Sequence, residues 1–71
     1  MNLVIREERK RRGWTLTEVT TRTGIATADL SVLERGLRPA FPGWRQRLSA
    51  VFGLPEEELF SVVGEGDDDA A

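Results

Sequence analysis

The sequence contains no cysteine and no histidine among its 71 residues. Without cysteine the chain has no disulfide bond and no thiol nucleophile, and without either residue it lacks the usual zinc ligand sets. The missing disulfides are consistent with a reducing compartment. Because the chain is also short, we expect no enzymatic activity, no metal and no cofactor.

Long apolar segments are also missing. No apolar run approaches the roughly 20 residues that cross a bilayer. Charged side chains directly follow the apolar residues Leu3, Val4 and Ile5, so the N-terminus has no signal-peptide core. We therefore expect a soluble, cytoplasmic protein with no membrane contact. A chain of 71 residues has room for one domain, which buries about 60% of the surface of its unfolded chain.

The net charge of −2 hides an asymmetry along the chain. All ten Lys and Arg residues lie at or before Arg47, and with five acidic residues before Pro55 they give residues 1–54 a charge of +5. From Pro55 onward there are seven acidic residues and no basic one, a charge of −7. This division indicates a face that binds polyanions and a solvated tail. We expect a domain over residues 1–63 and a disordered acidic tail over 64–71.

Residue periodicity and helix-stop signals predict five short helices and no strand. Glycine caps or prolines separate the predicted helices, which cover residues 2–12, 16–23, 27–35, a segment around 44–52, and a fifth from Pro55. The apolar residues assigned to the fifth helix are Leu59, Phe60, Val62 and Val63. For Val62 and Val63, burial in the core and contact with a second copy both remain open. Trp14 and Trp44 fit apolar helix patterns and are expected in the core.

The clearest local signal is the start of the second helix. Thr15 precedes Glu18 by three residues, which is the spacing of a capping box. Trp14 before the cap and Val19 inside the helix are placed for a hydrophobic staple. Because several threonines follow, packing against the rest of the domain must hold this helix.

Two helices of about eight residues joined by a turn at Gly24 match a helix-turn-helix. The spacing predicts that a small core closes between them, formed by Val19, Ile25, Leu30 and Leu33. The opposite face of the segment 27–35 then points outward, where a helix can enter the major groove of DNA.

The chain resembles the Cro/C1-type, or Xre, family of helix-turn-helix domains over about residues 3–60. The resemblance is carried by Arg9-x-x-x-Gly13-Trp14-Thr15-Leu16-Thr17-Glu18-Val19, by Thr23-Gly24-Ile25, by Leu30-Ser31-x-Leu33-Glu34-Arg35-Gly36-x-Arg38-x-Ala40, by Pro42-Gly43-Trp44-Arg45-x-Arg47-Leu48, and by Phe52-Gly53-Leu54-Pro55-x-x-x-Leu59-Phe60. It implies an all-α, compact five-helix bundle like that of lambda repressor. It also implies a regulator of transcription that binds double-stranded DNA, and we expect a repressor, with a homodimer on a two-fold operator.

The resemblance also implies roles for individual residues. Arg9 and Glu34 correspond to an ion pair that ties the first helix to the third, and Leu16 and Thr17 lie where family members offer backbone N–H groups to phosphate. Leu16 stands where many members have Gln, which weakens that contact. Thr20 stands where members usually have Ala.

The expected DNA contacts divide into two sets. Contacts to bases are expected from Thr27, Ala28, Ser31, Val32 and Arg35. Contacts to phosphate are expected from Leu16, Thr17, Lys10, Arg22 and Arg38. Asp29 can accept a hydrogen bond from a cytosine amine, although a stabilising role at the helix N-terminus is favoured.

A second function remains open at this point. The outward face of the third helix has no Gln or Asn to read bases, position 16 is apolar and the tail is acidic. These features suit a protein-interaction module on the same fold, whose partner is another regulator, a polymerase subunit or a toxin. A continuous positive surface beside the third helix would favour DNA, and an apolar patch there would favour a protein.

Overall fold

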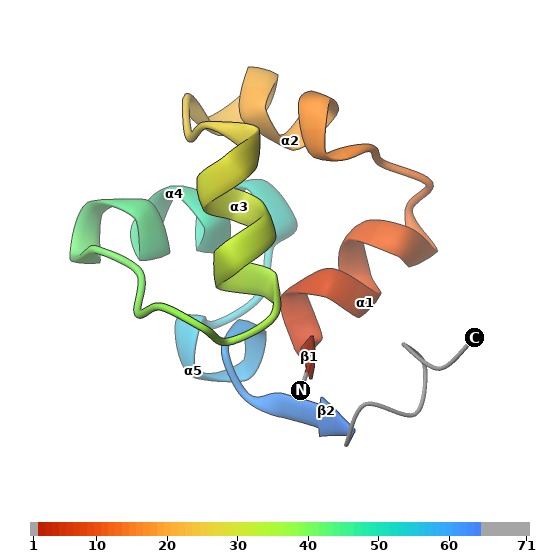
Figure 1. The fold of residues 1–71 in the computed structure, drawn as a ribbon, viewed down its shortest axis with the longest axis vertical. Helices are drawn as coiled ribbons and strands as arrows, with labels where there is room; N and C mark the ends of the chain where they lie inside the picture. Colours follow the sequence, from red (N-terminus) through yellow and green to blue (C-terminus); the bar gives the residue numbers. More distant parts are fainter. Residues whose placement is uncertain (1, 65–71) are drawn as a thin grey trace.

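The computed structural model describes residues 2–64, which form five helices and two short strands (Figure 1). In chain order these are β1 (Asn2–Leu3), α1 (Val4–Arg11), α2 (Leu16–Thr23), α3 (Thr27–Glu34), α4 (Pro42–Phe52), α5 (Glu56–Leu59) and β2 (Val62–Gly64). The predicted all-α bundle of five helices is confirmed for this part of the chain. Residues 65–71 of the predicted tail over 64–71 lie outside the described residues.

α2 has the predicted bounds, and its start shows why. The Thr15 hydroxyl accepts a hydrogen bond from the Glu18 backbone N–H at 3.1 Å, and the Glu18 carboxylate accepts one from the Thr15 N–H at 2.8 Å. At the other end Gly24 has a φ of +80°, a left-handed conformation that other residues adopt only with strain. The capping box and this glycine therefore define the helix at both ends.

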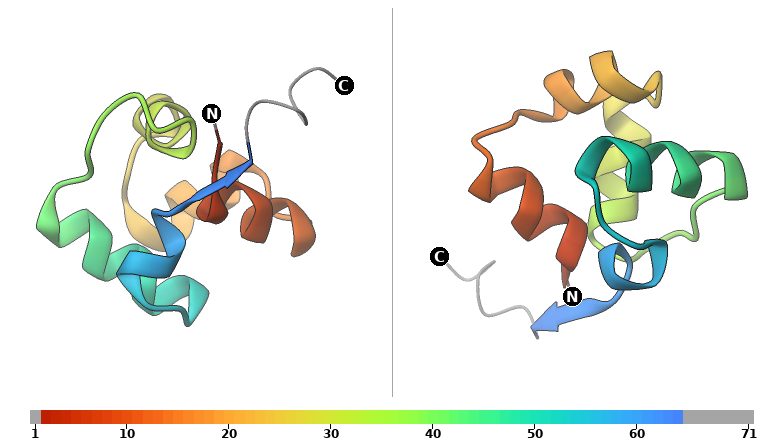
Figure 2. Two further views of the ribbon diagram at one scale, coloured as in Figure 1. Left: turned by 90° about the horizontal axis from the view of Figure 1, so that it is seen from below. Right: turned by 180° about the vertical axis from the view of Figure 1, so that it is seen from behind.

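The ends of the domain differ from the prediction. The chain forms an antiparallel pair in which Asn2 lies opposite Gly64 and Leu3 opposite Val62, and the Val4 N–H donates to the Ser61 carbonyl at 2.9 Å. The predicted helix over 2–12 therefore begins only at Val4, and Gly64 belongs to β2 rather than to the tail. The pairing gives partners to backbone groups that the two ends of a longer helix would leave unpaired. Figure 2 shows the strand pair closing the domain at one edge.

Other helix bounds are also corrected. α5 is a single turn that ends at Leu59, so Val62 and Val63 lie in β2 and not in the predicted fifth helix. β-branched residues favour extended backbone, which fits this placement. α3 ends at Glu34, with Arg35 as its C-cap. Pro42, which precedes the segment predicted around 44–52, lies at the start of α4, where a missing N–H costs nothing.

The core lies where the helices meet. The predicted residues Val19, Ile25, Leu30 and Leu33 are all buried at 1% exposure. Residues from β1, α1, α4 and α5 complete the core, namely Leu3, Ile5, Leu48, Phe52 and Leu59. Trp14 and Trp44 pack against it from the edge. Among residues 2–64 no helix is both long enough and apolar enough to cross a membrane.

Candidate nucleic-acid interface

The turn between α2 and α3 is held by the last residue of α2. The buried Thr23 hydroxyl donates to the Val19 carbonyl at 2.8 Å and accepts from the Ile25 N–H at 3.2 Å. This bonding directs the chain through Gly24, while Ile25 enters the core. The angle between α2 and α3 is therefore set by side chains on both sides of the turn.

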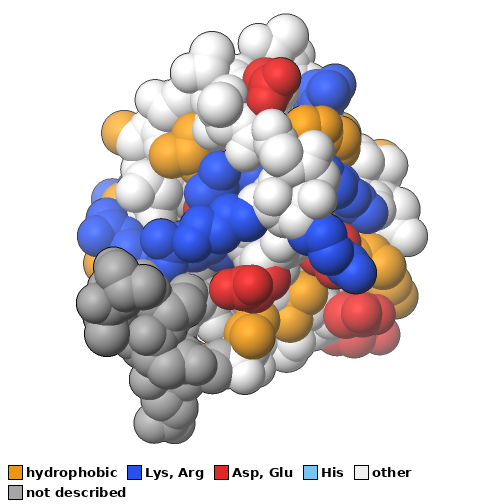
Figure 3. Space-filling view, turned by 90° about the vertical axis from the view of Figure 1, so that its right-hand side faces the viewer, with side chains coloured by type: hydrophobic (Ala, Val, Ile, Leu, Met, Phe, Trp, Pro, Cys, Tyr) orange, Lys and Arg blue, Asp and Glu red, His pale blue; other side chains and the backbone are white. Residues whose placement is uncertain are grey.

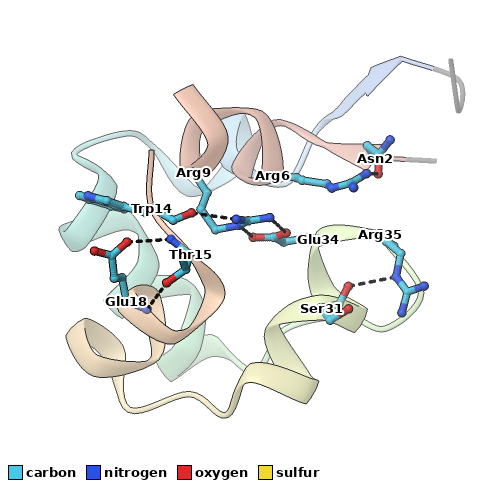
Figure 4. A network of polar contacts seen from close by, with 9 residues as sticks. All are labelled: Asn2, Arg6, Arg9, Trp14, Thr15, Glu18, Ser31, Glu34 and Arg35. Carbon is cyan, nitrogen blue, oxygen red and sulfur yellow. Dashed lines mark hydrogen bonds and ion pairs between the residues drawn. The ribbon is translucent and has the colours of Figure 1, made fainter. Parts of the chain in front are cut away.

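α3 presents the predicted side chains on the surface. Thr27, Ala28 and Arg35 are exposed, and Ser31 and Val32 are half-buried. Leu30 and Leu33 hold the opposite side of the helix in the core. The Arg35 Nε donates to the Ser31 carbonyl at 3.3 Å, so this guanidinium lies back along its own helix (Figure 4).

A bidentate ion pair fixes α3 against α1. The Arg9 Nε lies 2.6 Å from one Glu34 carboxylate oxygen, and the Arg9 Nη2 lies 3.1 Å from the other. A third nitrogen of Arg9 donates to the Trp14 carbonyl at 2.8 Å, so one guanidinium joins α1, α3 and the segment before α2 (Figure 4). Both side chains are largely buried, at 13% exposure for Arg9 and 4% for Glu34. This arrangement is the pair that the resemblance implied.

The expected phosphate contacts have different surroundings. Leu16 is half-buried and packs against the core, whereas Thr17 beside it is exposed at the start of α2. Lys10 is exposed on α1. The Arg22 guanidinium lies 4.4 Å from the centre of the Trp14 ring, and the Arg38 Nη1 lies 3.4 Å from the Asp29 carboxylate. The structure thus leaves Thr17 and Lys10 open to solvent and gives Arg22 and Arg38 partners within the domain.

The structure also gives several other arginines internal partners, which the sequence reading missed. Arg12 donates to the Phe52 carbonyl at 2.9 Å, and Arg47 donates to the Thr23 carbonyl at 3.3 Å. These arginines hold the C-terminal ends of α4 and α2, where a positive charge is favourable. Their partners lie 40 and 24 residues away, so no local pattern signals them.

Glu8 is a further missed residue, and in its case the sequence does hold a signal. It is buried and pairs with Arg11 and Arg12, which lie three and four residues later on the same side of the helix. This spacing is the ordinary one for helical ion pairs. The buried Glu8 carboxylate therefore neutralises part of the positive charge at the end of α1.

The surface beside the helix-turn-helix carries both positive charge and apolar groups. Figure 3 shows Lys and Arg side chains gathered in a band over α1. The loop after α3 exposes two large apolar side chains, Leu37 at 68% and Phe41 at 61%. No group of three or more His, Cys, Asp or Glu side chains within residues 2–64 is arranged to hold a metal ion.

Comparison with known proteins agrees with this geometry. A family model described as a helix-turn-helix domain matches residues 3–60. Uncharacterized HTH-type transcriptional regulators of Mycobacterium bovis and Mycobacterium tuberculosis are 35% identical to the chain over 66 residues. The match covers 93% of this chain but only 26% of each relative. No solved structure matches significantly. Since the family match spans the five helices, this chain belongs to the helix-turn-helix domain family.

Proposed function

We propose that the chain is the DNA-binding part of a transcriptional regulator and that α3 reads the major groove of double-stranded DNA. The observation that carries the proposal is the placement of α3, whose exposed residues project while Leu30, Leu33 and the Arg9–Glu34 pair hold its other side. A rigidly held helix with a free face is what groove recognition requires. The names of the mycobacterial relatives support a role in regulation.

In this proposal the two sets of contacts follow the exposed side of the helix-turn-helix. Bases are contacted by Thr27, Ala28, Ser31, Val32 and Arg35, and phosphates by the start of α2 and by Lys10, Arg22 and Arg38. A guanidinium carries five N–H donors, so Arg22 and Arg38 retain donors for phosphate beside their present partners. The short side chains of α3 suit thymine methyl groups more than bidentate hydrogen bonding, which favours modest specificity.

The finer assignment is a Cro/C1-type repressor that binds a two-fold operator as a homodimer. It rests on the motif from Leu33 to Gly36 at its distance from Gly24. Two-fold operators place half-sites about 34–36 Å apart, or multiples of this spacing. Sequencing of duplexes selected from a random library reports the base preference and the half-site spacing together.

The decisive test compares two exposed alanines. Ala28 lies in the first turn of α3 and Ala50 in α4, and both are exposed. Ala28→Glu adds a carboxylate to the proposed reading face, whereas Ala50→Glu adds the same charge elsewhere. We expect Ala28→Glu to weaken duplex binding more than tenfold, since like charges at an interface cost several kcal/mol. Ala50→Glu should cost less than threefold.

Salt dependence gives a second readout of the same proposal. If Lys10, Arg22 and Arg38 each contact a phosphate, the logarithm of the binding constant should fall against the logarithm of salt concentration with a slope of about −2.7 per domain. Equal effects of the two alanine substitutions would contradict groove reading by α3. Absence of binding to any duplex at low salt would contradict DNA binding as a whole.

The exposed Leu37 and Phe41 favour a second candidate, a protein-interaction module. Exposed apolar side chains mark a contact site for another protein where they form one contiguous patch. Replacing both residues with Ser distinguishes the candidates. A DNA-binding domain keeps its duplex affinity within about twofold, because neither residue lies on α3. An interaction module loses saturable binding to its protein partner, and added DNA does not compete for that partner.

A further inference from the structure

α3 shows only one of its two carboxylates to solvent. Its acidic residues are Asp29 and Glu34, and Glu34 is buried against Arg9. The Asp29 side chain is 34% exposed. Asp29 lies in the first turn of the helix, directly after the exposed Thr27 and Ala28. This first turn is the part of a recognition helix that reaches base edges.

The partner of Asp29 holds it loosely. The Arg38 Nη1 lies 3.4 Å from the Asp29 Oδ1, which is longer than the about 2.7–2.9 Å of a strong charge-assisted hydrogen bond. Arg38 is 55% exposed and lies in the loop after α3. A pair this open adds little to stability, so its two members can change partners at low cost. The pair is thus poorly explained as a structural support.

DNA offers a better partner to each member of the pair. Phosphate suits the Arg38 guanidinium. In the major groove, a carboxylate accepts a hydrogen bond from the N4 amine of cytosine. Adenine also presents an amine, N6, but its neighbouring N7 acceptor repels a carboxylate, as do thymine O4 and guanine O6 and N7. Asp29 therefore weakens DNA binding at most base pairs. It strengthens binding where its carboxylate accepts a hydrogen bond from a cytosine amine.

From this we infer that Asp29 determines specificity by selecting a cytosine in the major groove, while Arg38 exchanges Asp29 for a phosphate. The inference rests on the proposed function, since it names a base that the same interface selects. It also supplies discrimination that the short side chains of the exposed α3 face lack.

The test selects duplexes from a random library with the wild-type chain, with Asp29→Ala, with Asp29→Asn and with the control Glu57→Ala. Glu57 is exposed on α5, so its removal changes the net charge equally but away from α3. Wild type and the control should enrich cytosine at one position of each half-site. Asp29→Ala should lose that preference, and Asp29→Asn should move it to adenine, with which an amide forms two hydrogen bonds.

Affinity for random duplexes provides the second readout. Removing the Asp29 charge should raise that affinity by roughly fivefold. This factor corresponds to the repulsion between two like unit charges about 4 Å apart in water. The Glu57 control should raise it by less than twofold. Circular dichroism establishes that each variant is folded.

Two results overturn the inference in distinguishable ways. Identical base preferences for wild type and Asp29→Ala overturn the role of Asp29 while leaving DNA binding in place. Failure of the wild-type chain to bind any duplex overturns the proposed function and this inference with it.

Discussion

Removing one member of the buried Arg9–Glu34 pair should destabilise the domain strongly, whereas replacing both members together should change its stability much less. Arg9→Met leaves the Glu34 carboxylate at 4% exposure without its cation. Breaking a buried pair in this way costs about 3–5 kcal/mol. A domain of 71 residues is stable by only about 4–11 kcal/mol, so this single change removes a large part of the total.

The combined change Arg9→Met with Glu34→Leu should behave differently. It replaces both charges with apolar groups of similar length, which is often neutral or stabilising. The Trp14 carbonyl still loses its donor, at a cost of about 1 kcal/mol. We therefore expect the double variant to be within about 2 kcal/mol of wild type and clearly more stable than the single variant.

Urea denaturation measures both free energies of unfolding. With a slope of about 1 kcal/mol per molar urea, the single variant should lose about 3–5 M in midpoint. As a control, Glu56→Gln removes the partly exposed pair that Glu56 forms with Arg45. The two side chains are 36% and 33% exposed, respectively, and the substitution should cost less than about 1 kcal/mol. A double variant as unstable as Arg9→Met would refute the reasoning, because the cost would then not come from the stranded charge.

Three further substitutions test the local structure of the helix-turn-helix by the same denaturation assay. Thr20→Ala should stabilise the domain by about 1 kcal/mol, because the buried Thr20 hydroxyl has no hydrogen-bond partner in the described structure and alanine is the better helix former. A loss of stability in this variant would contradict the explanation. Thr15→Ala should cost about 1 kcal/mol by removing half of the capping box, and an unchanged midpoint would mean that Glu18 alone suffices. Gly24→Ala should cost about 1–2 kcal/mol for its left-handed φ of +80°, although an added Cβ would meet only the Arg47 guanidinium at 4.0 Å. The control Gly43→Ala, in α4 with open space around it and no positive φ, should instead be neutral or stabilising.

The parts of the fold that could be predicted are those with local signals. The capping box at Thr15 and the glycine at position 24 set the bounds of α2 to the residue, because both act within four residues. The apolar spacing of Val19, Ile25, Leu30 and Leu33 likewise identified the core between α2 and α3. Here local propensity and tertiary packing favour the same structure.

The parts that were missed depend on contacts between distant residues. The pairing of Asn2 and Leu3 with β2 joins segments about 60 residues apart, and two or three residues are too few to show an alternating pattern. The arginines that hold the ends of α2 and α4 are a similar case. Their positive charge fits a DNA phosphate as well as a backbone carbonyl, so the residue type does not identify the partner. The number of charged residues could be counted from the sequence, but the partners of their side chains could not be identified from it.

The surroundings of Trp14 give this domain an internal optical probe. The indole lies 5.3 Å from the Phe52 ring centre and 4.4 Å from the Arg22 guanidinium, so it touches groups from α2 and α4 at once. Trp44 sits apart, against Phe41 at 4.7 Å in the neighbouring loop. In a Trp44→Phe background, fluorescence emission would come from Trp14 alone. Separation of α2 from α4 could then be followed by emission wavelength in real time, without any attached dye.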